Sequence, residues 1–215
     1  MQAERTQLRV GRIPRYVWGY LAAMLLVQLL VFYGTRFVLP FLPKYHLDTA
    51  LDAMIPFRPG WIVVYYVSFA FWIVSAVLIL AESRAYARRA AASYMLAMIL
   101  SGVFFLAFPT TITRPASDGS GFFPSCVRLL YQIDSPENLF PSLHVLVTYY
   151  CLRAAKGSRW FPKWFFPAGA AFLILVCISI LLIKQHVIAD IPAGIAVAEL
   201  SLQLVLFRKE KLRRN

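Results

Sequence analysis

Two histidines and an aspartate are the residues of this chain best suited to chemistry. His186 and Asp190 lie four residues apart in the segment KQHVIAD, so a helical turn places both on one face. A carboxylate there accepts a hydrogen bond from one ring nitrogen and leaves the other free as a nucleophile. His144, in the segment PSLH, can protonate a leaving alkoxide and then deprotonate an incoming water or alcohol. These residue types predict group transfer through a covalent intermediate on His186.

Cations and a hydroxyl close to these residues indicate that the transferred group is an anion. Arg114 lies in the segment TRPAS, Ser142 lies two residues before His144, and Lys184 lies two residues before His186. The free N–H groups at the start of a helix, together with Ser142, can bind phosphate oxygens. The sequence has no carboxylate cluster suited to Mg²⁺. We therefore expect a phosphohistidine route without metal or cofactor, in which Arg114, Ser142 and Lys184 bind the substrate.

The segments that carry these residues are apolar enough to cross a membrane. Of the 215 residues, 60% are hydrophobic and 15% are charged, whereas a soluble domain has roughly 45–50% apolar and about 25% charged residues. Several apolar runs reach the ~20 residues that span a bilayer. The runs are continuous and do not alternate with a period of two, so they predict helices and not membrane strands.

We predict an all-α integral membrane protein, a bundle of six transmembrane helices in one domain that covers residues 1–215. The fourth helix is the least regular of the six, because it is short and contains a threonine and two tyrosines. The predicted spans cover residues 17–39, 61–81, 91–108, 139–155, 164–183 and 187–207.

The basic residues predict how this bundle is oriented. Sixteen of the 22 Lys and Arg residues fall on the side of both chain ends, and the positive-inside rule makes that side cytoplasmic. The site would then face outward, and we expect it at the outer face of the plasma membrane. The net charge of +12 fits anionic lipid headgroups better than nucleic acid, because the basic residues lie between apolar runs. The six basic residues of the outer side are Arg36, Lys44, Arg58, Arg114, Arg128 and Lys184.

The three motifs, in this order and topology, resemble those of the type 2 phosphatidic acid phosphatase superfamily of membrane lipid phosphatases and phosphotransferases. That family has the motifs Lys-x6-Arg-Pro, Pro-Ser-Gly-His and Ser-Arg-x5-His-x3-Asp. TRPAS matches the end of the first motif, PSLH matches the second and KQHVIAD matches the end of the third. The resemblance covers residues 61–206 and implies a core of six helices and a lipid phosphate substrate.

The chain departs from the family pattern at three positions. Ala107 stands where the first motif has lysine, Leu143 replaces the glycine of the second, and Ile180 replaces the arginine of the third. The phosphate-binding set therefore lacks two cations, and we expect Lys184 to replace one of them, with Arg128 as the weaker alternative. PSLH and a basic residue before the last histidine are more similar to the inositol phosphorylceramide synthase branch, whose members transfer headgroups between lipids.

Four functions are weighed against these residues. A lipid phosphate phosphatase is the first reading, and a lipid headgroup phosphotransferase is a close alternative. A non-catalytic lipid-binding or transport protein on the same scaffold would explain the missing cations, but not the retained histidines and aspartate. A channel or secondary transporter would need polar residues at mid-membrane depth, and the second, third and fifth predicted helices have few. The lipid and the oligomeric state are left open by the sequence.

Overall fold

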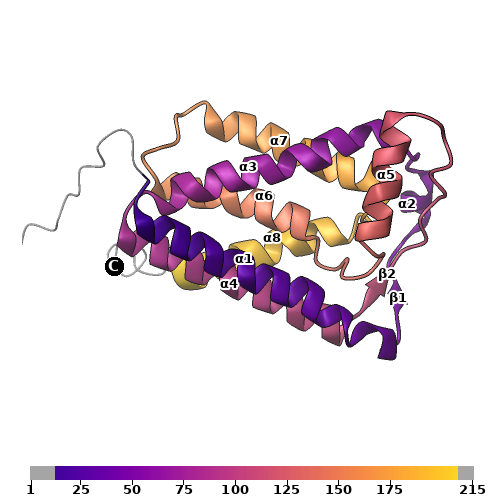
Figure 1. Ribbon diagram of the computed structural model, residues 1–215, viewed down its shortest axis with the longest axis horizontal. Helices are drawn as coiled ribbons and strands as arrows, with labels where there is room; N and C mark the ends of the chain where they lie inside the picture. The colour runs from indigo at the N-terminus through magenta and orange to yellow at the C-terminus, as the bar shows by residue number, and fades with distance from the viewer. Residues whose placement is uncertain (1–12, 208–215) are drawn as a thin grey trace, which may run out of the picture.

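Four long helices of the computed structural model, which describes residues 13–207, have the length and apolarity to cross a membrane. They are α1 (Arg15–Arg36), α3 (Ile62–Leu80), α4 (Arg84–Ala107) and α7 (Phe165–Leu182). They run side by side along the long axis of the molecule (Figure 1). The predicted all-α membrane class is therefore confirmed.

Two shorter helices, α6 (Leu143–Ala154) and α8 (Asp190–Ser201), complete the bundle. Each has 12 residues, fewer than the ~20 that span a bilayer, so the six-span count stays a prediction. A 3-10 turn (Ala155–Gly157) follows α6, and a π-helix (Leu202–Leu206) follows α8. Nine of the twelve residues of α6 are buried, because α3, α7 and α8 pack around it. This central position lets α6 hold a side chain away from lipid and water.

Tyrosine hydroxyls join α4 to α6. Tyr150 donates to the carbonyl of Ala90 at 2.6 Å, and Tyr86 donates to the carbonyl of Ala154 at 2.6 Å. Both hydroxyls are buried, where a missing hydrogen-bond partner would be costly. The two bonds fix the position of α6 along the axis of the long helix α4.

Small elements absent from the predicted fold gather at one end of the bundle (Figure 1). The parallel strands β1 (Tyr45–His46) and β2 (Thr110–Thr111) pair there, with Tyr45 opposite Thr110. The short 3-10 helices there cover Leu39–Phe41 and Pro59–Trp61. The α-helices at this end are α2 (Ala50–Met54) and α5 (Phe122–Ile133).

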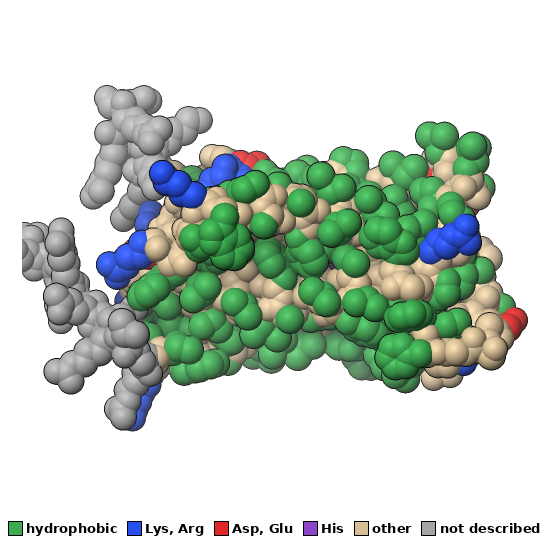
Figure 2. Space-filling view, turned by 90° about the horizontal axis from the view of Figure 1, so that it is seen from above, with side chains coloured by type: hydrophobic (Ala, Val, Ile, Leu, Met, Phe, Trp, Pro, Cys, Tyr) green, Lys and Arg blue, Asp and Glu red, His purple; other side chains and the backbone are tan. Residues whose placement is uncertain are grey.

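The opposite end of the bundle carries most of the described basic residues. Figure 2 shows apolar side chains along the length of the molecule and Lys and Arg side chains mainly at the end where α1 and α4 begin. This segregation agrees with the predicted charge asymmetry, although Arg5, Arg9 and Arg12 and the five basic residues after 207 lie outside the described residues. The described basic residues of this end are Arg15, Arg84, Arg88, Arg89, Arg153, Lys156, Arg159 and Lys163.

Candidate active site

His186 and Asp190 form a buried pair at the start of α8. The Nδ1 atom of His186 lies 2.9 Å from Oδ2 of Asp190, and their side chains are 7% and 0% exposed. Asp190 Oδ2 also accepts the backbone N–H of Val187 at 3.0 Å. An ionised carboxylate only accepts hydrogen bonds, so Nδ1 must carry the proton of the neutral imidazole. Nε2 of His186 is then the nitrogen with a free lone pair.

His144 faces this pair from the first turn of α6. Ser142 begins that helix, because its Oγ accepts the N–H of Val145 at 3.4 Å. The backbone N–H of Ser142 donates to the carbonyl of Asp190 at 3.2 Å, so the two helix starts are joined directly. The ring centroids of His144 and His186 are 6.1 Å apart. The structure thus brings together the three residues that the sequence selected as catalytic.

Aromatic rings of α3 surround His144. The ring centroids of Tyr65, Trp72 and Phe69 lie 4.1, 5.1 and 5.6 Å from that of His144. Trp72 donates to Thr148 Oγ1 at 2.9 Å, and Thr148 donates in turn to the carbonyl of His144 at 2.7 Å. The Nε2 atom of His144 is buried and has no hydrogen-bond partner within residues 13–207. Aromatic surroundings that exclude water strengthen the electrostatic interactions of His144 with a ligand bound beside it.

Gly194 allows α8 to approach α6 closely enough for this geometry. A Cβ atom at this position would lie 2.7 Å from the carbonyl oxygen of Ser142 and 3.2 Å from the backbone nitrogen of Leu146. Both neighbours are backbone atoms, so no side-chain rotation can relieve the clash. The distance between the two histidines therefore depends on this glycine.

We expect Gly194→Ala to move α8 away from α6, lowering both the melting temperature and activity toward a lipid phosphate. Inserting an atom into a packed contact typically costs about 1–3 kcal/mol, and misplacement by about 1 Å can cost roughly 100-fold in rate. Gly19→Ala is the matched control, because nothing lies within 4 Å of its added Cβ. Equal activity of the two variants would show that the helix contact does not set the site.

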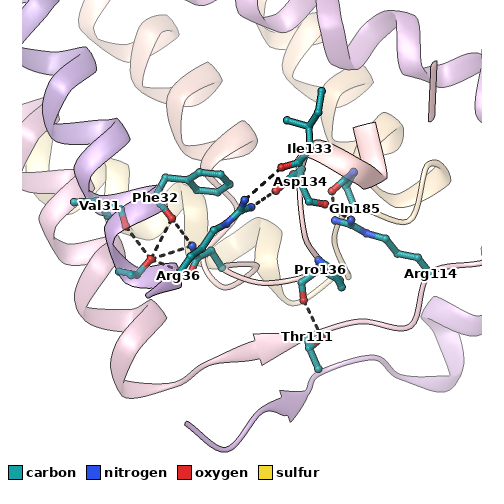
Figure 3. A network of polar contacts seen from close by, with 11 residues as sticks. Val31, Phe32, Arg36, Thr111, Arg114, Ile133, Asp134, Pro136 and Gln185 are labelled. Atoms are coloured by element: carbon teal, nitrogen blue, oxygen red, sulfur yellow. Dashed lines mark hydrogen bonds and ion pairs between the residues drawn. The ribbon is translucent and has the colours of Figure 1, made fainter. Parts of the chain in front are cut away.

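Arg114 belongs to a polar network with Arg36, Asp134 and Gln185, which come from three other segments (Figure 3). These four residues are called the mouth of the site below. The guanidinium of Arg114 donates to Gln185 Oε1 at 2.5 Å and to the backbone carbonyl of Asp134, and it lies over the ring of Tyr131 at 4.7 Å. Asp134 forms an ion pair with Arg36 at 2.5 Å. Gln185, which is 2% exposed, precedes His186 directly. Two cations therefore contact Asp134 and Gln185, which line the cavity together with the histidines.

Burial makes these mouth charges depend on one another. Burial raises the pKa of Asp134, while Arg114 and Arg36 act to lower it. Burial likewise lowers the pKa of the Arg114 guanidinium, against the raising effect of Asp134 and Tyr131. Removing one partner of such a set leaves an uncompensated charge, which is strongly destabilising.

Ser142 and Lys184, two of the expected substrate-binding residues, have other contacts in the structure. Ser142 is fully buried as the cap of α6. Lys184 donates to the carbonyls of Asp52 and Ile55 at 2.9 and 2.6 Å. Asp52 Oδ1 accepts the N–H of Ile188 at 2.8 Å. Lys184 and Asp52 thus fasten the turn that carries His186 to α2. Neither Ser142 nor Lys184 lines the cavity described below, and Arg114 and Arg36 reach it only through their contacts with Gln185 and Asp134.

Arg128, the weaker alternative, is also engaged elsewhere. It donates to the carbonyls of Ser117 and Gly119 at 2.5 and 2.9 Å and to Ser125 Oγ at 2.6 Å. These bonds hold the loop before α5 against that helix. Only Arg114, of the cations selected from the sequence, joins the network at the mouth.

Sequence reasoning missed Arg36, Asp134 and Gln185. Gln185 had a signal, because it directly precedes the nucleophile candidate. Arg36 and Asp134 had none, because the ends of α1 and α5 meet only in the folded chain. The third histidine, His46, is exposed and lies 3.3 Å from Asp48. In the described part of the chain, no three or more His, Cys, Asp or Glu side chains are grouped as ligands of a metal ion.

A cavity of about 580 Å³ extends from the histidines into the apolar interior. Its polar end is lined by Asp134, Gln185, His144 and His186, and its walls come from α1, α3, α4 and α6. The lining of α3 runs from Tyr65 to Leu80, which is about 22 Å along a helix axis. The cavity therefore covers much of the ~30 Å hydrocarbon thickness of a bilayer.

The cavity opens toward the surrounding bilayer between α1 and α3. Its lining includes apolar side chains on both helices that are exposed on the outside of the bundle. An apolar molecule could enter here without crossing water. The exposed lining residues on the two helices are Leu25, Leu29, Tyr33, Tyr66, Phe69 and Ile73.

A membrane helix bundle with a His–Asp pair opposite a second histidine is the arrangement expected of a membrane-embedded phosphatase or phosphotransferase. The family model of the PAP2 superfamily, the type 2 phosphatidic acid phosphatases, matches residues 53–204, and the chain belongs to this family. The resemblance read from TRPAS, PSLH and KQHVIAD is thereby confirmed. No curated protein and no solved structure matches the chain.

Proposed function

We propose that this protein is a lipid phosphate phosphatase that works through a phosphohistidine intermediate. The cavity is the observation that carries the proposal, because it joins two histidines to a long apolar space. A ligand that fits such a cavity has a small polar head and an apolar chain. A lipid phosphate places its phosphate at the histidines and its chain between the helices.

The first step of the proposed reaction forms the phosphohistidine. Nε2 of His186 attacks phosphorus, an N–P bond forms and the P–O bond to the lipid breaks. His144 gives its proton to the leaving alkoxide. Asp190 holds the Nδ1–H of His186 and balances the positive charge that develops on the ring, as their 2.9 Å contact allows.

The second step releases phosphate and restores the enzyme. His144, now neutral, takes a proton from water, the water oxygen attacks phosphorus and the N–P bond breaks. The separation of 6.1 Å between the ring centroids leaves room for a phosphoryl group between the two histidines. The guanidinium of Arg114, beside Gln185, stabilises negative charge on the phosphoryl oxygens. These residues supply the chemistry without a metal ion.

Headgroup transfer to a second lipid is the other candidate, and α5 favours it. This helix lies beside the site, where Tyr131 donates to the carbonyl of Ile183 at 2.8 Å. Its outer surface exposes apolar side chains that can rest on the bilayer and admit a second lipid. These side chains are Phe122, Phe123, Leu129 and Ile133.

The orientation belongs to the same proposal. The basic end of the bundle faces the cytoplasm with both chain termini, and the histidines face the outside of the plasma membrane. The segregation of the described basic residues supports this orientation. The protein acts as one membrane domain over residues 1–215.

The test is a panel of lipid phosphates incubated with purified protein in detergent and EDTA. The panel contains phosphatidate, phosphatidylglycerol phosphate, a polyprenyl diphosphate and a sphingoid base phosphate. We expect inorganic phosphate at many turnovers per protein for at least one of them. If phosphate stays at background and a headgroup-exchanged lipid forms once diacylglycerol, ceramide or inositol is added, transfer replaces hydrolysis. If neither product forms, the chain is a non-catalytic lipid-binding member.

A further inference from the structure

We propose that Arg36, at the end of α1, is a phosphate-binding cation of this site, and that Asp134 holds it there until the substrate phosphate replaces the carboxylate. This assignment rests on the proposed function. It explains how the chain works with Ala107 and Ile180 in place of two family cations.

The position of Arg36 is the first observation that supports its assignment as a phosphate-binding cation. Its Nη2 lies 2.5 Å from Oδ1 of Asp134, and Asp134 lines the polar end of the cavity with Gln185 and His186. The guanidinium stacks on the ring of Phe32 at 4.3 Å, which directs it inward from α1. Figure 3 shows Arg36 and Arg114 approaching Asp134 from opposite sides. Arg36 binds the carboxylate of Asp134, and Arg114 binds the backbone carbonyl of the same residue.

Buried nitrogen atoms without a hydrogen-bond partner are the second observation that supports Arg36 as a phosphate-binding cation. Within residues 13–207, Arg36 Nε, Arg114 Nε, Gln185 Nε2 and His144 Nε2 are buried and have no hydrogen-bond partner. Buried polar atoms without a partner are rare in folded proteins, and each calls for an explanation. Three of the four are obligatory donors, and phosphate oxygens are acceptors. A phosphate at the mouth would satisfy several of them together.

Asp134 is suited to be replaced by phosphate. Carboxylates and phosphates both bind the fork of a guanidinium through paired N–H donors. Burial raises the pKa of Asp134, so its charged form is less favourable here than in water. A phosphate dianion carries more charge and more acceptor atoms than the carboxylate, so it competes well for the same guanidinium. The carboxylate keeps Arg36 oriented while the site is free.

The other candidate cations are committed to structural contacts. Lys184 is bound to the carbonyls of Asp52 in α2 and of Ile55 just after it, and Arg128 is bound to its own loop. Arg36 has an exchangeable partner, because its main bond is to a side-chain carboxylate on another segment. Among the cations of residues 13–207 at this end, Arg36, Arg114 and Lys44 are joined to residues that line the cavity, Lys44 as an exposed side chain paired with Glu137.

The experiment measures binding of inorganic phosphate to the full-length protein in detergent, by the phosphate-dependent rise in melting temperature, alongside lipid phosphate turnover. We expect Arg36→Ala to weaken phosphate binding and to lower kcat/KM by roughly 100-fold, the usual effect of losing one donor to an oxyanion. Arg36→Lys should recover part of both. Asp134→Asn should bind phosphate several-fold more tightly, because a competing anion is removed. Arg58→Ala is the control, because Arg58 is an exposed arginine at the same end of the bundle and does not line the cavity.

Several results would overturn the assignment. Phosphate binding by Arg36→Ala equal to that of the wild type would remove Arg36 from the site, and so would absence of phosphate binding by the wild type. Weaker phosphate binding in Asp134→Asn would show that the ion pair is only structural. If Arg36→Ala does not fold, Arg36→Lys and Asp134→Asn still carry the test. If phosphate binding requires Arg36 but no lipid is turned over, the cation site stands and the catalytic function fails.

Discussion

His186→Asn should lower turnover of a lipid phosphate by at least about 10⁴-fold, because the variant has no nucleophile to form the covalent intermediate. Asparagine is chosen because its amide N–H can replace Nδ1–H as the donor to Asp190, so the buried carboxylate keeps a partner. We therefore expect a melting temperature close to that of the wild type. The measurement is the initial rate of phosphate release together with a thermal melt.

The control for this change is His46→Ala, which removes an exposed histidine outside the site. It should retain full activity. Activity of His186→Asn within about tenfold of the wild type would eliminate His186 as the nucleophile, since a lost covalent route costs far more.

Asp190→Asn should lower kcat/KM by roughly 10³–10⁴-fold with little change in stability, because a neutral amide cannot balance the positive charge that develops on the ring of His186. Asp190 Oδ2 now accepts both the Nδ1–H of His186 and the N–H of Val187. An asparagine oxygen at the Oδ2 position can keep both bonds, with its NH₂ at the Oδ1 position, which has no hydrogen-bond partner within residues 13–207. The variant thus keeps the orientation of His186 but lacks the negative charge that stabilises the ring when it attacks phosphorus.

The tautomer of His186 separates the loss of charge from a loss of orientation in this variant. Nitrogen NMR of histidine-labelled protein should show the proton on Nδ1 in both the wild type and Asp190→Asn, although the variant has lost activity. An active variant with an unchanged tautomer would show that Asp190 only caps the start of α8.

The gathering of His144, His186 and Asp190 was predictable from the sequence for two physical reasons. Residues four apart on a helix share a face, which fixes the His186–Asp190 pair. Helices that cross a membrane alternate in direction, so the segments before α6 and α8 must meet at one end. The closeness of 6.1 Å between the histidine rings was not predictable, because it depends on the contact of Gly194 with α6.

The cations of the mouth were only partly predictable. The sequence shows that Lys184 lies near His186, but an ammonium group binds carbonyls as readily as phosphates. Its choice of the α2 carbonyls depends on a five-residue helix that hydropathy does not detect. Arg36 and Asp134 are 98 residues apart and belong to segments with no shared pattern. Sequence proximity therefore pointed to Lys184, whereas the fold pairs Arg36 with Asp134, which lines the cavity.

The limits of the helices differ from the predicted ones where capping, not hydropathy, decides them. The predicted helix 91–108 begins seven residues earlier, at Arg84, because Ser83 Oγ accepts the N–H of Tyr86 at 3.2 Å. The predicted helix 139–155 begins four residues later, at Leu143, because Ser142 caps it. Apolar residues before Ser142 belong to the turn, and hydropathy cannot distinguish a turn from a helix. The predicted ends of α3 and α7 agree within one residue.

Trapping of the phosphoenzyme is the most direct test of the phosphohistidine mechanism. His144→Gln is incubated with a radiolabelled lipid analogue whose aryl leaving group needs no proton, so that the first step proceeds and the second stalls without a base. We expect acid-labile label on the peptide that contains His186, and none when His186→Asn is added to the same chain. Label on another residue, or no label while the leaving group is released in a burst, would contradict a phosphohistidine at His186.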